Sequence, residues 1–122
     1  MILLVDDEPT VRQFVRTVLE RTGYEVVEAA GAEEALLILR DRQLPPQALL
    51  TDIVMPGRNG IWLAAQFHRI YPGVPVLFIS GFAQTYLEEL SGSVCLRKPF
   101  TPAELVAAVA DLIGSGRSAG GM

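Results

Sequence analysis

At 122 residues, half of them hydrophobic, the chain has the size and composition of one globular domain and not of a disordered segment. A net charge of −4 and a pI of about 4.9, without a run of Lys or Arg, argue against direct nucleic-acid binding. A single cysteine excludes an internal disulfide framework and fits a reducing compartment, so we expect a cytoplasmic protein. We also expect no signal peptide and no membrane segment, because no basic region precedes the first apolar run and no apolar run could span a bilayer.

Short apolar runs alternate along the chain with longer amphipathic stretches, which is typical of βα units and a mostly parallel sheet. The pattern predicts five strands, at residues 2–5, 24–29, 48–51, 74–79 and 94–97. It predicts five helices, at residues 8–22, 31–44, 60–70, 83–90 and 101–113. The fourth helix is expected to be short. We therefore expect one domain over residues 1–114, followed by a flexible Gly/Ser-rich tail over residues 115–122.

The last predicted helix has a strong start signal. Thr101 stands at the N-cap position, Pro102 at the first helical position and Glu104 two residues further on. A Thr and a Glu at this spacing satisfy each other's backbone N–H groups, so the helix is expected to begin at Pro102.

Polar side chains collect where four of the five predicted strands end. They are Asp6 and Asp7 after the first strand, Asp52 after the third, Ser80 after the fourth and Lys98 after the fifth. The second strand ends in Glu28-Ala29 and adds nothing obvious. Right-handed crossovers bring all strand carboxyl ends to one edge of the sheet, where α/β folds bind ligands.

Three carboxylates at one edge repel one another unless a cation joins them. Oxygen ligands without a nearby His or Cys suit a hard ion, Mg²⁺ or Mn²⁺. Lys98 and the Ser80 hydroxyl could then bind the remaining oxygens of a phosphoryl group. A nucleophilic carboxylate, a metal and two groups that stabilise an oxyanion are what the formation of an aspartyl phosphate requires.

In this order and at these strand ends, four short motifs resemble the receiver domain of two-component response regulators. They are Val5-Asp6-Asp7-Glu8, the run from Asp52 to Gly57, Ile79-Ser80-Gly81 and Lys98-Pro99-Phe100. The resemblance covers residues 1–114 and implies a flavodoxin-like doubly wound sheet of five parallel strands in the order 2-1-3-4-5. The motif Ile79-Ser80-Gly81-Phe82 resembles the corresponding segment of receivers attached to hybrid histidine kinases.

The resemblance implies a role for each matching residue. Asp52 would be the phosphorylated residue, and Ser80 and Lys98 would bind the phosphoryl group. Asp7 would bind Mg²⁺ directly with Asp52 and the backbone carbonyl of Val54, and Asp6 would help to position the ion, largely through water. The Lys98–Pro99 peptide would be cis. The donor would be a phosphohistidine on a histidine kinase or a phosphotransfer protein, and the receiver would position and neutralise the transferred group.

Three features depart from the family pattern. The position three residues before the lysine, where receivers carry a switch aromatic, is Cys95. Ser80 and Lys98 are 18 positions apart, about one helical turn fewer than in most receivers, which places the loss in the fourth helix. The two positions that often tune hydrolysis, Val54 and Phe82, are both apolar and could not position an attacking water, so we expect a slowly hydrolysed phosphoaspartate.

Four functional readings compete. The leading one is a phosphoacceptor module of a two-component system or phosphorelay that acts on a downstream protein target. We expect no enzymatic activity beyond self-phosphorylation and slow autophosphatase activity. The module would act as a monomer or a homodimer. A phosphorylation-independent pseudo-receiver that only binds proteins is the alternative. A phosphatase-like hydrolase would need a second carboxylate just after the nucleophile, where Ile53 and Val54 stand. A flavin carrier would need a Gly/Ser/Thr-rich phosphate loop where Asp7-Glu8-Pro9 stands.

Overall fold

The computed structural model describes residues 1–42, 44–81 and 94–121, with side chains given up to residue 114 apart from residue 94. In chain order the elements are β1 (Ile2–Val5), α1 (Pro9–Arg21), β2 (Val26–Ala29), α2 (Ala32–Arg40), β3 (Ala48–Asp52), α3 (Gly60–Ile70), β4 (Val76–Ser80), β5 (Val94–Arg97) and α5 (Pro102–Gly121). The strict alternation of strands and helices that the sequence predicts is confirmed in these ranges. The predicted helix at residues 83–90 lies outside the described residues.

The five strands form one parallel sheet in the order β2-β1-β3-β4-β5, as predicted. β3 occupies the centre, in register with β1 from Ala48 to Thr51 and with β4 from Leu49 to Asp52. Both of its faces are covered, and all five of its residues are buried. A central strand without a solvent-facing side explains why its sequence is a continuous apolar run and not an alternating one.

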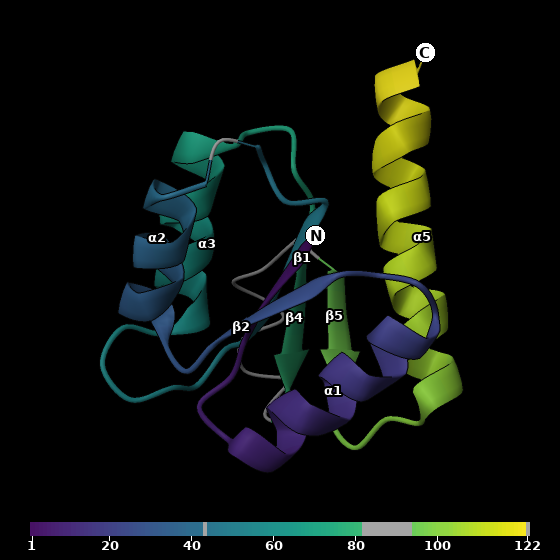
Figure 1. The fold of residues 1–122 in the computed structure, drawn as a ribbon, viewed down its shortest axis with the longest axis horizontal. Coiled ribbons are helices and arrows are strands. Elements are labelled where there is room, and N and C mark those ends of the chain that lie inside the picture. The colour runs from purple at the N-terminus through teal and green to yellow at the C-terminus, as the bar shows by residue number, and fades with distance from the viewer. Residues whose placement is uncertain (43, 82–93, 122) are drawn as a thin grey trace.

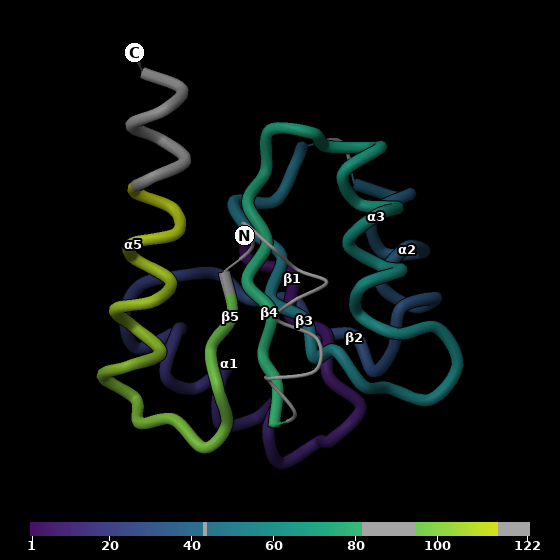
Figure 2. Tube along the Cα trace, turned by 180° about the vertical axis from the view of Figure 1, so that it is seen from behind, coloured from purple at the N-terminus to yellow at the C-terminus, as the bar shows by residue number. Residues whose placement is uncertain are grey.

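Two hydrophobic clusters fill the spaces on either side of the sheet. Alternate residues of β1 divide between them: Ile2 and Leu4 face α1 and α5, whereas Leu3 and Val5 face α2 and α3. Figures 1 and 2 show this arrangement, with α2 and α3 together on one side of the sheet and α1 and α5 on the other. None of the helices in the described part of the chain combines the length and hydropathy that a membrane crossing requires.

The last helix begins as predicted and continues further. Thr101 Oγ1 accepts a hydrogen bond from the Glu104 N–H at 3.1 Å, and Glu104 Oε1 accepts one from the Thr101 N–H at 3.2 Å. α5 extends to Gly121. An existing helix grows by one backbone hydrogen bond per residue, which is easier than starting a new one. The flexible tail over residues 115–122 and the boundary at residue 114 stay predictions.

Candidate functional site

Three carboxylates meet at the carboxyl edge of the sheet. Asp6 and Asp7 follow β1, and Asp52 is the last residue of β3. One carboxylate oxygen from each lies within 4.8 Å of the others. Asp6 is fully buried, Asp52 is 6% exposed and Asp7 is half-buried. The structure therefore brings together the three acidic residues that the sequence assigned to one edge.

Lys98 lies against two of these carboxylates. Its Nζ is 3.2 Å from Asp52 Oδ2 and 3.3 Å from Asp6 Oδ2. The backbone helps to place it, because the Lys98 N–H donates to the Ser80 carbonyl at 2.9 Å and joins the ends of β4 and β5. The Lys98–Pro99 peptide is cis, as the resemblance implied. The lysine thus holds one oxygen of Asp52 while the Ile53 N–H donates to the other at 2.8 Å.

Burial and charge act in opposite directions on this group. Burial raises the pKa of Asp52, and the negative charge of Asp6 adds to the effect, while Lys98 opposes both without cancelling them. Burial alone would lower the pKa of Lys98, but Asp52 and Asp6 together raise it above the ordinary lysine value. The lysine therefore carries its positive charge at neutral pH, next to a carboxylate that is costly to ionise.

The other residues singled out from the sequence differ in burial and position. Ser80 is buried as the last residue of β4. Val54, two residues beyond Asp52, is 46% exposed. Phe82 lies outside the described residues. Cys95 is a half-buried free thiol whose pKa is raised by burial, with Arg97 acting weakly the other way. It packs against the cluster on the α2/α3 side of the sheet, which fits a packing residue and not a nucleophile.

The backbone that follows Asp52 is held by the start of α3. The Gly60 N–H donates to the Ile53 carbonyl at 2.8 Å. A Cβ at residue 60 would overlap the Asp52 carbonyl oxygen and lie 3.1 Å from the Ile53 Cα. Glycine is therefore required here for close approach of two backbone segments, a requirement that the sequence did not reveal.

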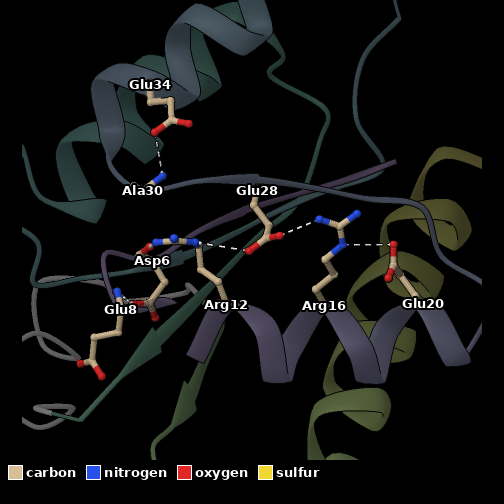
Figure 3. Close-up of polar contacts among 8 residues, drawn as sticks. All are labelled: Asp6, Glu8, Arg12, Arg16, Glu20, Glu28, Ala30 and Glu34. Carbon is tan, nitrogen blue, oxygen red and sulfur yellow. Dashed lines mark hydrogen bonds and ion pairs between the residues drawn. The ribbon is translucent and has the colours of Figure 1, made fainter. Parts of the chain in front are cut away.

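Arg12 and Glu28 are the residues that the sequence reading missed. Arg12, in the first half of α1, donates from Nη1 to the Asp6 carbonyl at 2.6 Å, and its Nε lies 3.3 Å from Glu28 Oε1 (Figure 3). The second strand, which showed nothing obvious in the sequence, thus contributes Glu28 as a partner of Arg12. Two sequence signals could have found this contact. Glu28 is two residues beyond the buried Val26, so its side chain lies on the same face of β2, the face that α1 covers. Arg12 and Arg16 are four residues apart and so lie on one face of that helix.

An apolar groove runs from the site along α1. One hollow of about 460 Å³ is lined by Thr10, Val11, Phe14, Lys98, Pro99 and Phe100. A second of about 570 Å³ shares Thr10 and Phe14 with it and continues along α1 to Thr22. The Phe14 and Phe100 rings lie 6.0 Å apart, and Phe14 is 40% exposed. The groove thus joins Lys98 to an exposed aromatic surface.

The donor atoms of the acidic group fit Mg²⁺. All of them are carboxylate oxygens, from Asp6, Asp7 and Asp52. Asp6 and Asp52 are buried at the carboxyl edge of the sheet. Mg²⁺ is bound in proteins by one or two carboxylates with waters and phosphate oxygens completing its shell. A cation here would also relieve the repulsion among the three charges.

A doubly wound sheet of this strand order, with an acidic pocket and a lysine at its carboxyl edge, defines a flavodoxin-like α/β domain built for phosphate chemistry. The family model for the response regulator receiver domain matches residues 2–110. The chain belongs to that family, whose members are the phosphoacceptor modules of two-component systems.

Curated relatives and solved structures agree with this membership. The phosphate regulon transcriptional regulatory protein PhoB of Pseudomonas aeruginosa is 34% identical, with 87% of this chain and 48% of that protein covered. The response regulator receiver protein CpdR of Brucella abortus is 38% identical, with coverages of 86% and 89%. The crystal structure of the receiver domain from the hybrid histidine kinase CckA superposes with a TM-score of 0.80 at 35% identity, with coverages of 92% and 97%. The chain thus spans about half of PhoB and most of CpdR.

Proposed function

We propose that Asp52 accepts a phosphoryl group from a phosphohistidine of a histidine kinase or phosphotransfer protein. The observation that carries this proposal is the position of Asp52, buried within reach of Lys98 Nζ at 3.2 Å and beside Asp6 and Asp7. An Asp52 oxygen attacks phosphorus, the phosphorus–nitrogen bond breaks, and its electron pair returns to the donor imidazole, which then takes up a proton. Lys98 neutralises charge on the phosphoryl oxygens, and the Ser80 hydroxyl donates to another of them.

The same proposal assigns the metal ligands. Asp7, Asp52 and the backbone carbonyl of Val54 would hold Mg²⁺, or Mn²⁺, and Asp6 would orient the ion largely through water. When bound, the ion would neutralise negative charge shared between the carboxylates and the phosphoryl oxygens. Support comes from the three clustered carboxylates and from the absence of any His or Cys in that group among the described residues.

The test is labelling by a small phosphodonor. The purified chain is incubated with acetyl phosphate and Mg²⁺, and its intact mass is followed. We expect one added phosphoryl group in the wild type and in Asp41→Asn, which changes an exposed carboxylate at the end of α2. We expect none in Asp52→Asn. Equal labelling of the wild type and Asp52→Asn would overturn the assignment.

The phosphorylated form is proposed to be long-lived. Val54, two residues beyond Asp52, is 46% exposed, and its apolar side chain has no group that could hydrogen-bond an attacking water. We expect the added mass to persist for minutes or longer after removal of acetyl phosphate in Mg²⁺. Decay within seconds would contradict this, and Val54→Asn is expected to shorten the lifetime.

The setting of the domain belongs to the proposal as well. Its output is proposed to be a protein contact in the cytoplasm and not DNA binding, because the net charge is −4 and the one cysteine is a free thiol. The relatives allow a stand-alone regulator, as the coverage of CpdR suggests, or a part of a longer protein. The alternative of a phosphorylation-independent module finds no support, since the acidic group and Lys98 are assembled together.

A further inference from the structure

A chain of polar contacts leads from β2 through α1 to the acidic site. Glu28 on β2 binds two arginines of α1: its Oε1 lies 3.3 Å from Arg12 Nε and its Oε2 lies 2.7 Å from Arg16 Nη1. Arg12 continues the chain by donating to the Asp6 carbonyl oxygen, whereas Arg16 turns away to Glu20 at 3.2 Å (Figure 3). Of the two arginines, Arg12 is the one that contacts the acidic site.

Asp6 is fixed through every polar atom it has. Its N–H donates to the Ala29 carbonyl at 3.2 Å, and its Oδ1 accepts from the Glu8 N–H at 2.9 Å. Its Oδ2 pairs with Lys98. The carbonyl oxygen, the atom bonded to Arg12, belongs to the peptide that joins Asp6 to Asp7. Arg12 therefore holds the peptide unit from which both carboxylates project.

The geometry suits an arginine that is itself held still. The Arg12 side chain is 18% exposed and that of Glu28 is 26% exposed, so both are largely withdrawn from water. A guanidinium holds its donors in one rigid plane and can fix two acceptors in a set orientation, whereas the ammonium of a lysine is a point charge on a flexible stem. Glu28 balances the positive charge and orients the plane, so that the guanidinium binds the backbone and does not compete with a cation for the carboxylates.

We propose that Arg12 is a positioning residue for the metal ligands Asp6 and Asp7, and that Glu28 keeps Arg12 in place. This inference rests on the proposed function, because it assumes that Asp6 and Asp7 take part in binding Mg²⁺. It extends the acceptor site to one residue of α1 and one residue of β2.

Charge alone predicts the opposite effect. Removing Arg12 takes away a positive charge near a cation site and leaves Glu28 with one partner fewer, which by Coulomb attraction would tighten Mg²⁺ binding. Loss of positioning would weaken it, because partners that orient metal ligands are typically worth 10- to 100-fold in affinity. The sign of the change therefore separates the two explanations.

The experiment measures Mg²⁺ affinity by titration calorimetry in the wild type, Arg12→Ala and Arg16→Ala. Arg16→Ala is the matched control, since it removes an arginine from the same helix and the same glutamate without touching Asp6. We expect binding about 10-fold weaker in Arg12→Ala and unchanged in Arg16→Ala. Glu28→Gln, which leaves Arg12 in the chain, is expected to fall between them and serves if Arg12→Ala does not fold. Equal or tighter binding in Arg12→Ala would overturn the inference.

Two further readouts exclude a merely structural effect. With acetyl phosphate, Arg12→Ala should need more Mg²⁺ for half-maximal labelling but reach the wild-type rate at saturation. In metal-free protein, the Glu8 amide should exchange its hydrogen faster in Arg12→Ala than in Arg16→Ala, because its acceptor Asp6 Oδ1 is no longer fixed. If the wild type binds no Mg²⁺, the proposed function fails. The hydrogen exchange of the Glu8 amide then tests by itself whether Arg12 positions Asp6. Equal exchange rates in Arg12→Ala and Arg16→Ala would overturn the inference.

Discussion

Asp52 is held between opposing forces at the scale of a single residue. Its burial disfavours the ionised carboxylate, and the negative charge of Asp6 adds repulsion. Lys98, at 3.2 Å, stabilises the ionised form but only partly offsets these two effects. The pKa of Asp52 is accordingly raised above its ordinary value of 3.8. A carboxylate kept in an unfavourable charged state gains when a cation arrives, which suits an acceptor that works with Mg²⁺.

This raised pKa predicts how stability depends on pH in the absence of metal. Between the unfolded and folded pKa values of Asp52 the folded state binds more protons, so the free energy of unfolding falls as pH rises through the folded pKa. Asp52→Asn removes that loss. We expect Asp52→Asn to be more stable than the wild type at pH 7 in EDTA, and the difference to vanish as the pH falls below 3.8. Urea unfolding across this pH range measures it.

The exposed Asp41→Asn is the control for that series and should follow the wild type at each pH. An Asp52→Asn variant less stable than the wild type at pH 7 would show that the pair with Lys98 outweighs the burial of the carboxylate.

At the scale of elements, the end of β3 and the start of α3 fit together only because residue 60 is glycine. The Gly60 N–H donates to the Ile53 carbonyl, and the backbone of Asp52 fills the space where a Cβ would be. Asn59 caps the helix by accepting from the Trp62 N–H at 2.8 Å. These contacts fix the backbone at the end of β3, and hence the position of the Asp52 carboxylate.

We therefore expect Gly60→Ala to be destabilising by about 1–3 kcal/mol, the usual cost of forcing a methyl group into packed space. The obstruction is backbone, so no side chain can rotate away to relieve it. Labelling by acetyl phosphate should slow as Asp52 is displaced. Gly73→Ala is the matched control, because a Cβ there meets nothing within 4 Å. Urea unfolding of both variants decides, and a Gly60→Ala as stable as Gly73→Ala would contradict the prediction.

The elements also show what sequence patterns can and cannot reveal. The strand ends followed from apolar runs and their polar terminators, since a central strand such as β3 must be apolar on both faces. The strand order came from the resemblance to receiver domains and not from the pattern itself. The predicted strand at 74–79 is β4 at Val76–Ser80. Pro75 has no N–H to donate to the ladder, so the strand begins only after it. The contact of Arg12 with Asp6 was missed because it depends on how α1 lies across β2. Which side chains of two different elements meet is decided by how the elements pack, and the local sequence gives only weak signals of it.

At the scale of the whole molecule, the groove between α1 and the segment after β5 lies next to the acceptor site. Lys98 lines its first hollow, and the exposed ring of Phe14 lies in the wall shared by both hollows. A phosphohistidine must be brought to Asp52 by the protein that carries it, and that protein has to cover surface beside the site. The apolar groove is continuous with Lys98, so we expect the donor protein to pack against Phe14.

Phe14→Ala should therefore separate two kinds of phosphodonor. Transfer from a phosphohistidine-bearing protein that labels the wild type should slow by about 10-fold, the usual effect of truncating a central aromatic contact. Labelling by acetyl phosphate should not change, because Phe14 is not one of the three residues of the acidic group. Leu37→Ala is the matched control, since Leu37 is an exposed apolar residue, 56% accessible, on α2 across the sheet. Phosphotransfer kinetics with both donors measure the difference. An equal loss with both donors would place the effect in the site itself, and no loss with the protein donor would remove the groove from the docking surface.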